Sequence, residues 1–100
     1  MIQGNSLMPI SSVYFPITRV YASLMADKII LCESGWDNAA RGKANEIGIA
    51  QFLPQTWEWM SELSGLNGNI YNETDQLELL EWALESGYKN HWSCVKILGL

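Results

Sequence analysis

Three segments of this chain carry apolar side chains at helical spacing, and a glycine follows each of them. The segments are residues 17–34, 54–64 and 75–86. Glycine readily adopts the left-handed conformation that closes many helices, so Gly35, Gly65 and Gly87 are the expected helix ends. No segment has the pattern of a strand. The spacing therefore predicts an all-α domain.

The rest of the chain supplies an arm, a loop and a short last helix. Residues 1–16 contain one glycine and two prolines, and we expect an irregular arm there, with the domain over residues 17–100. Pro16 suits a first helical turn, and the helix after it is apolar on nearly all sides, which predicts a central, buried position. Residues 35–50 have no sustained periodicity and are expected to form a long loop. With a short helix over about residues 90–98, the prediction is a small domain of about four helices.

The composition narrows the class of function. A chain of 100 residues has room for one hydrophobic core, so we expect a single domain, and we expect it to be a monomer. The net charge of −5, with only six basic side chains, argues against binding to nucleic acid. No stretch approaches the roughly 20 apolar residues of a membrane span, and residues 1–21 show no secretory signal. Five tryptophans indicate either an aromatic core or a groove for flat, half-apolar ligands such as sugars.

Glu33 interrupts the apolar character of the first helix at its C-terminal end. Helical geometry places it on the boundary between the apolar arc and the narrow polar side, and its charge faces the negative end of the helix dipole. Partial burial and the dipole both raise the pKa of a carboxyl group. A raised pKa keeps a proton available near neutral pH, which is what a general acid needs. The alternative is that Glu33 extends into solvent or pairs with Arg41 or Lys43.

Two motifs surround this carboxylate. The first is Glu-Ser-Gly-Trp at residues 33–36, and the second is Gly-Ile-Ala-Gln-Phe-Leu-Pro-Gln-Thr-Trp at residues 48–57. Together they resemble the lytic transglycosylase (SLT) and goose-type lysozyme family, whose pattern is a helix-ending Glu-Ser, a variable loop, and then Gly-Leu-Met-Gln-hydrophobic-x-Pro-x-Thr. Residues 69–77 and 92–94 look like the later part of small members of this family. The resemblance covers about residues 24–98.

The resemblance implies cleavage of the β-1,4 bond between N-acetylmuramic acid and N-acetylglucosamine in peptidoglycan. The family residue that matches Glu33 protonates the leaving glycosidic oxygen as a general acid. It then acts as a base toward the sugar's own 6-hydroxyl, which gives a 1,6-anhydro product, or toward water, as in a lysozyme. Gln51 and the backbone of Gly48 match positions that line the sugar groove, and Ser34 matches a residue close to the catalytic carboxylate. The implied site of action is extracytoplasmic: periplasm, cell wall, secreted or delivered by a phage.

An ordinary glycosidase needs a second carboxylate. The candidates are Asp37, Glu46, Glu73 and Asp75, and none lies in a motif that singles it out. A mechanism with one carboxylate and the substrate's own hydroxyl is therefore the simpler hypothesis, so we favour a transglycosylase over a hydrolytic muramidase. A module that binds glycan or a protein partner without cleaving anything is the other alternative.

The sequence departs from the family pattern at two places. Ala50 stands where the family usually has Met before Gln51, which puts a smaller side chain in the groove wall. No Ala-Tyr-Asn motif follows the third helix, although in many members that tyrosine lies beside the catalytic Glu. Tyr88 with Asn90 is the candidate to take over part of this work, so Tyr88 joins the expected substrate-binding residues.

The remaining aromatic and titratable residues divide between core and groove. Trp57 and Trp92 lie on inward-facing helical positions, which favours the core. Trp36 and Tyr71 lie in loops and are candidates for stacking on sugar rings. His91 is the only histidine and has no Cys or carboxylate at ligand spacing, so we expect no metal site and no cofactor.

Cys32 and Cys94 leave two alternatives, a disulfide or two buried free thiols. Because the family that this chain resembles works outside the cytoplasm, we expect the disulfide. It would close a loop of roughly 60 residues and contribute about 4 kcal/mol in the chain-entropy model. The bridge would tie the helix that ends in Glu33 to the C-terminal end of the chain.

Overall fold

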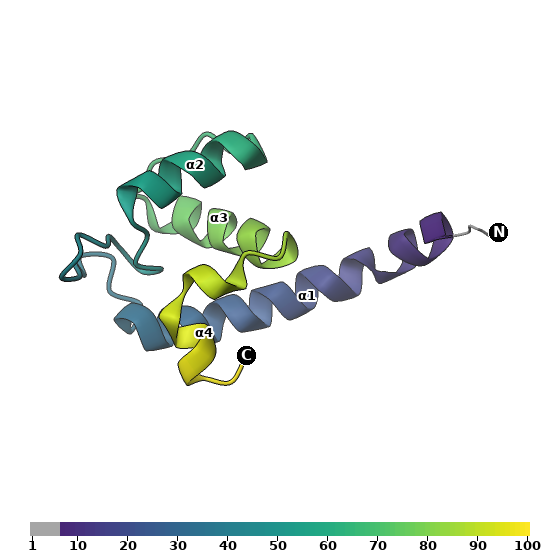
Figure 1. Cartoon of the computed structure of the whole chain (residues 1–100), viewed down its shortest axis with the longest axis horizontal. Helices are drawn as coiled ribbons and strands as arrows, with labels where there is room; N and C mark the ends of the chain where they lie inside the picture. The colour runs from purple at the N-terminus through teal and green to yellow at the C-terminus, as the bar shows by residue number, and fades with distance from the viewer. Residues whose placement is uncertain (1–6) are drawn as a thin grey trace.

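The computed structural model describes the backbone of residues 7–100 and the side chains of residues 19–100 (Figure 1). In chain order its elements are α1 (Leu7–Ser34), α2 (Pro54–Ser64), α3 (Glu73–Glu85), the 3-10 helix η1 (Lys89–His91) and α4 (Ser93–Ile97). No strand forms among the described residues, where the only bridges link Arg41 with Ile47 and Ile47 with Phe52. The predicted all-α domain of four helices, with a long loop after the first, is confirmed.

The helices form a small layered arrangement. α3 lies between α1 and α2, and α4 packs against α1 (Figure 1). The N-terminal part of α1 extends away from the other helices, whereas its C-terminal part lies beside α4 and the long loop (Figure 1). None of the helices in the described residues has the length and hydropathy that crossing a membrane requires.

α1 begins at Leu7, so the prediction of an irregular arm is wrong for residues 7–16, while residues 1–6 lie outside the described part of the chain. Pro9 falls in the first turn, where its missing N–H would have no acceptor within the helix. Pro16 removes one donor from the helix interior without ending the helix. The predicted domain boundary at residue 17 therefore does not coincide with a helix start.

Over residues 19–34, the part of α1 whose side chains are described, the helix is buried along one face only, which corrects the expectation of a helix buried on nearly all sides. Its buried residues are Ala22, Met25, Ala26, Ile29 and Ile30. On other sides, four large apolar side chains are between 57% and 65% exposed: Val20, Tyr21, Leu24 and Leu31. The reason is the size of the domain, because the elements that pack against α1 are α3 and α4, and together they cover one side.

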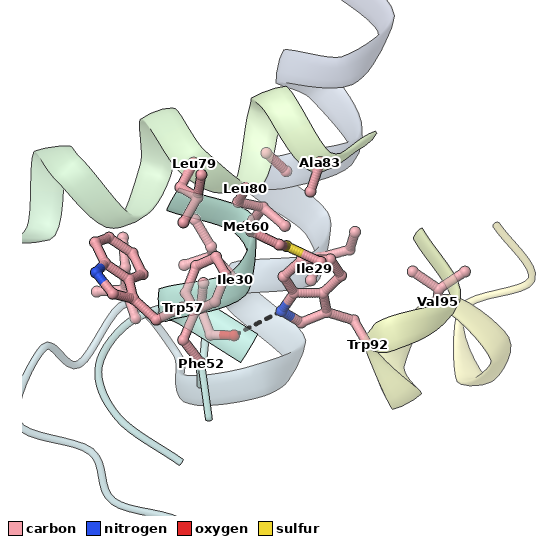
Figure 2. Close-up of a cluster of buried hydrophobic side chains, with 13 residues drawn as sticks. Ile29, Ile30, Phe52, Trp57, Met60, Leu79, Leu80, Ala83, Trp92 and Val95 are labelled. Atoms are coloured by element: carbon pink, nitrogen blue, oxygen red, sulfur yellow. Dashed lines mark hydrogen bonds between the residues drawn. The ribbon is translucent and has the colours of Figure 1, made fainter. Parts of the chain in front are cut away.

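The hydrophobic core lies between the C-terminal half of α1 and the helices α2, α3 and α4 (Figure 2). Phe52 is almost fully buried, and its ring meets Trp57 at 4.9 Å and Trp92 at 5.3 Å between centroids, both in edge-to-face geometry. Such contacts add to the stabilisation from burying the rings. The prediction that Trp57 and Trp92 belong to the core is confirmed.

The helix ends follow local chemistry. Gly35, at φ +64°, donates its N–H to the carbonyl of Leu31 at 3.0 Å and terminates α1. α2 has the predicted bounds and ends in the same manner at Gly65. The last predicted helix is divided, because Trp92 adopts an extended conformation (φ −108°, ψ 121°) between η1 and α4. That break turns the chain so that the start of α4 faces the end of α1.

Candidate active site

Glu33 lies in the last turn of α1, half-buried at a cleft of about 190 Å³. Four parts of the chain form the cleft: the end of α1, the loop after it, the start of α2, and the segment from η1 to α4. The lining residues are Glu33, Glu46, Gln51, Phe52, Leu53, Thr56, His91, Trp92 and Ser93. The fold therefore brings Glu33 together with Gln51 from the second motif.

A disulfide lies directly beside Glu33. Cys32 is bonded to Cys94, with 2.10 Å between the sulfur atoms and 6.0 Å between the Cα atoms. The predicted disulfide is thus confirmed, and the alternative of two free thiols is wrong. The backbone N–H of Cys94 donates to Glu33 Oε2 at 3.3 Å. The bridge therefore joins the two segments that carry the carboxylate and its hydrogen-bond donor.

The pKa of Glu33 is raised above the ordinary value of 4.5 for a Glu side chain. Burial is the largest cause, because it disfavours the charged form, and the negative charge of Glu46 acts in the same direction. The hydrogen bond from Cys94 opposes both, because it stabilises the carboxylate. The guanidinium of Arg41 donates to carbonyl groups of its own loop. The surroundings of Glu33 agree with the prediction of a carboxyl group with a raised pKa. The hydrogen bonds of Arg41 do not support an ion pair between Arg41 and Glu33.

Glu46 is the candidate second carboxylate that lines the cleft. Its Oε1 accepts the backbone N–H of Ala44 at 2.9 Å, which holds the side chain against its own tight turn. Asp37 and Asp75 accept nearby backbone amides elsewhere, and Glu73 lies in the first turn of α3. The tertiary structure thus distinguishes Glu46 from the other three, which the sequence motifs do not.

Gln76 of α3 is fully buried, and the sequence reasoning missed its part in supporting the loop that carries the cleft wall. Its Oε1 accepts the N–H of Ala50 at 2.9 Å, and its Nε2 donates to the carbonyl oxygens of Ile47 at 2.8 Å and Ile70 at 2.7 Å. The indole N–H of Trp92 donates to the carbonyl of Ala50 at 2.8 Å, drawn as a dashed line in Figure 2. Both backbone groups of Ala50 are therefore held from inside the protein. A glutamine on the apolar face of its helix is the signal that could have found it.

Gly48 supports the loop from within and does not line the cleft. It has φ +82°, and a Cβ atom on it would collide with the side chain of Gln76. Gln51 does lie in the cleft wall, where its Nε2 donates to the carbonyls of Gly48 at 2.8 Å and Ala40 at 3.2 Å. The motif's glycine thus meets a steric requirement, while its glutamine faces the site.

Ser34 fastens the end of α1 to the loop. Its hydroxyl donates to the carbonyl of Ile49 at 2.7 Å and also reaches that of Ile30 at 3.4 Å. The side chain is half-buried and is not part of the cleft lining. Ser34 therefore ties the end of α1 to the loop and does not contribute to the cleft wall.

The aromatic candidates lie in two places. Trp36 and Tyr71 are exposed in loops and do not line the cleft. Tyr88 contacts three further rings, with centroid distances of 5.2 Å to Trp59, 5.7 Å to Trp82 and 6.2 Å to His91. Because His91 lines the cleft, the rings of Trp59, Tyr88 and His91 form an aromatic edge that continues from it. Neither Trp59 nor His91 is among the substrate-binding residues expected from the sequence, although Trp59 follows the second motif closely and His91 directly precedes Trp92.

Within the described part of the chain, no group of three or more His, Cys, Asp or Glu residues is placed to hold a metal ion. His91 packs on aromatic rings, at 5.6 Å from Trp59 and 6.4 Å from Trp92. The polar side chains that the cleft offers to a ligand are Glu33, Glu46, Gln51, Thr56, His91 and Ser93.

A sequence model of the family described as Transglycosylase SLT domain matches residues 19–94. The match begins within α1, ends at Cys94 and contains every residue that lines the cleft. No curated protein and no solved structure matches the chain.

Proposed function

The chain belongs to the transglycosylase SLT domain family, and we propose that it cleaves the β-1,4 bond between N-acetylmuramic acid and N-acetylglucosamine in peptidoglycan. The family consists of glycan-cleaving enzymes. The observation that carries the proposal is the placement of Glu33, which is half-buried in a cleft and has a raised pKa. These are the properties of a carboxyl group that donates a proton near neutral pH.

In the proposed reaction Glu33 starts in its protonated form. It gives its proton to the glycosidic oxygen while the bond between this oxygen and C1 of the muramic acid breaks, and positive charge develops on the sugar ring. The 6-hydroxyl of the same sugar then attacks C1 and returns a proton to the Glu33 carboxylate. The products are a 1,6-anhydro end and a chain with a free 4-hydroxyl, and Glu33 is again protonated.

The environment of Glu33 supports both halves of this cycle. Burial favours the protonated form that acts as the acid. The Cys94 N–H favours the carboxylate that acts as the base. A carboxyl group balanced between the two forms can change its protonation state twice in each turnover at a low energetic cost.

The glycan is proposed to contact Gln51 in the cleft wall and to stack on the aromatic edge through Tyr88. Trp36 and Tyr71 lie outside the cleft, and their exposure makes them available to a longer strand. Sugar rings stack on aromatic side chains because the apolar face of a pyranose covers the ring while its hydroxyls remain hydrated.

Ser34 and Gly48, which the family resemblance connects with substrate, are proposed to act on the substrate indirectly. Ser34 holds the loop to the end of α1, and Gly48 allows Gln76 to pack beneath it. Their substitution would displace the cleft wall that carries Gln51.

Hydrolysis is the second candidate, and the observation that favours it is Glu46. This carboxylate lines the same cleft as Glu33 and is close enough to raise its pKa. In two-carboxylate glycosidases the second group activates water or stabilises the charged sugar. Product mass separates the two reactions, because the 1,6-anhydro product is one water lighter than the hydrolysed one.

The proposal is tested by incubating purified peptidoglycan with the wild-type protein and with Glu33→Gln, followed by mass analysis of the released muropeptides. We expect at least a 100-fold loss of product with Glu33→Gln, because the variant has no proton to donate. Glu78→Gln on the exposed side of α3 is the matched control for the change in charge and should retain full activity. An inactive wild-type protein would favour a module that only binds glycan, and an active Glu33→Gln would refute the assignment of the acid.

The proposed substrate also determines where the protein would act. Peptidoglycan lies outside the cytoplasm, where a disulfide such as Cys32–Cys94 persists. The cleft is formed within one chain, which supports a monomer as the working unit.

A further inference from the structure

We propose that the Cys32–Cys94 disulfide is a positioning device for Glu33, which holds the backbone N–H of Cys94 on the carboxylate and thereby makes activity sensitive to reduction. Its effect on the position and proton affinity of Glu33 can be measured without the reaction, while its catalytic consequence rests on the proposed function.

The geometry links the bridge to the carboxylate through very few bonds. Cys32 directly precedes Glu33 in the last turn of α1, and Cys94 supplies both the partner sulfur and the donor N–H. The disulfide thus joins the end of α1, which carries Glu33, to the start of α4, which carries the donor N–H of Cys94. A carboxyl group held at one oxygen has its orientation limited, which leaves the other oxygen to serve the substrate.

α4 contains five residues, too few to be stable without tertiary contacts. Apart from the bridge, the segment is held by the buried side chains of Trp92 and Val95. We expect these contacts to keep the protein folded after reduction, and neither of them bonds the amide of Cys94 to Glu33. We therefore expect the reduced protein to be folded and to lose the alignment of this hydrogen bond.

The charges around Glu33 make this single donor important. Glu46 faces it from the loop and favours its protonated form. His91 lines the cleft from η1, while α2 contributes the uncharged Thr56 and the start of α4 contributes Ser93. The Cys94 N–H is the group that acts against burial and Glu46 in setting the proton affinity of Glu33.

The bridge is accessible to a reductant, because the Cys32 side of it is exposed. A dithiol such as dithiothreitol would supply two electrons and two protons, giving the thiols of Cys32 and Cys94 while the reagent becomes a cyclic disulfide. Reoxidation would reverse the reaction and restore the bond. The effect of the disulfide on Glu33 can therefore be measured on one sample, first on reduction and then on reoxidation.

The test compares the oxidised wild-type protein, the same protein after reduction, and Cys32→Ala/Cys94→Ala. The carboxyl carbon of Glu33 is titrated by NMR, with Glu33→Gln used to assign the signal, so this readout needs no enzymatic activity. We expect a higher titration midpoint in the reduced protein and in the double variant, because the carboxylate loses its donor. With peptidoglycan, we expect kcat to fall about tenfold with little change in KM, because Glu33 acts in the chemical step. Reoxidation should restore the wild-type values.

Val95→Ala is the matched control, since it loosens the packing of α4 but keeps the disulfide. It should lower the melting temperature without moving the Glu33 midpoint. If reduction leaves the Glu33 titration midpoint unchanged, as expected for Val95→Ala, or lowers it, the disulfide only stabilises the fold and the proposal is wrong. Should the double variant not fold, Cys94→Ser and the reduced protein, measured below their melting temperatures, provide the same comparison. If peptidoglycan is not cleaved by any form, the proposed function fails while the NMR result still decides the positioning role.

Discussion

Glu33 and Glu46 line the same cleft, and the charge of Glu46 opposes ionisation of Glu33. Glu33 combines burial with a neighbouring negative charge and one backbone donor, so its pKa reflects its burial and two partners from different parts of the chain. Such an arrangement is unfavourable for a residue that only has to be soluble, because the charged form is partly desolvated. It is useful for one that has to hold a proton and then release it.

At the residue scale, Glu46→Gln should shift the pH dependence of cleavage. Removing the Glu46 charge lowers the pKa of Glu33, so the protonated acid is lost at a lower pH. The alkaline, falling limb of kcat/KM against pH should therefore move to lower pH, and Glu78→Gln should leave it in place. If Glu46 is a second catalytic carboxylate, the plateau itself should also fall by about 100-fold or more. An unchanged limb would show that Glu46 does not influence the acid.

The elements position the site through one buried side chain of α3. Gln76 holds three backbone groups on two different segments, including the loop that carries the cleft wall. Without this tie, the long loop would depend on its own turns, on the hydrogen bonds from Ser34 and Trp92, and on its buried apolar side chains. A buried polar residue with all its hydrogen bonds made specifies one loop conformation.

At the element scale, Gln76→Leu should destabilise the protein by about 2–4 kcal/mol, because it keeps the volume but leaves buried backbone groups unpaired. Urea unfolding followed by tryptophan fluorescence measures the loss as a lower midpoint with a similar slope. Gln55→Leu, at an exposed position of α2, is the matched control and should change the midpoint little. A Gln76→Leu protein as stable as the wild type would mean that water or a rearranged loop satisfies these groups.

The whole molecule carries a net charge of −5. An acidic protein approaching an anionic cell wall is repelled at long range, so its encounter with substrate gains nothing from electrostatic steering. Binding of the proposed glycan substrate would then depend on the short-range contacts of the cleft and the aromatic edge. This fits a protein that acts close to the place where it is delivered.

At the scale of the molecule, the rate of wall cleavage should rise as salt increases from 10 to 150 mM, because the screening length falls from about 30 Å to about 8 Å. We expect an increase of roughly twofold to threefold in initial rate, measured as soluble product released at constant pH. An uncharged glycan oligomer serves as the control and should show little salt dependence. A steep decrease with salt would reveal a basic contact surface that the net charge conceals.

The parts of the fold that sequence reasoning predicted well are those with local causes. α2 begins at Pro54 and ends before Gly65 because the restricted proline ring and the left-handed glycine act on neighbouring residues only. The placement of Glu33 at the end of α1 depends on the same short-range rules. The start of α1 was predicted wrongly because a proline stops a helix in some positions and is tolerated in others.

The helical class, the helix ends marked by glycine and the carboxylate at the end of α1 follow from the order of residues along the chain. Three features emerge only from the packed structure: one face of α1 is buried, Glu46 shares the cleft with Glu33, and the amide of Cys94 reaches Glu33. The physical reason is the range of the interactions. Helix periodicity and capping act over a few residues, whereas burial and the pKa of Glu33 are set by segments that are distant in sequence and meet only after the chain has packed.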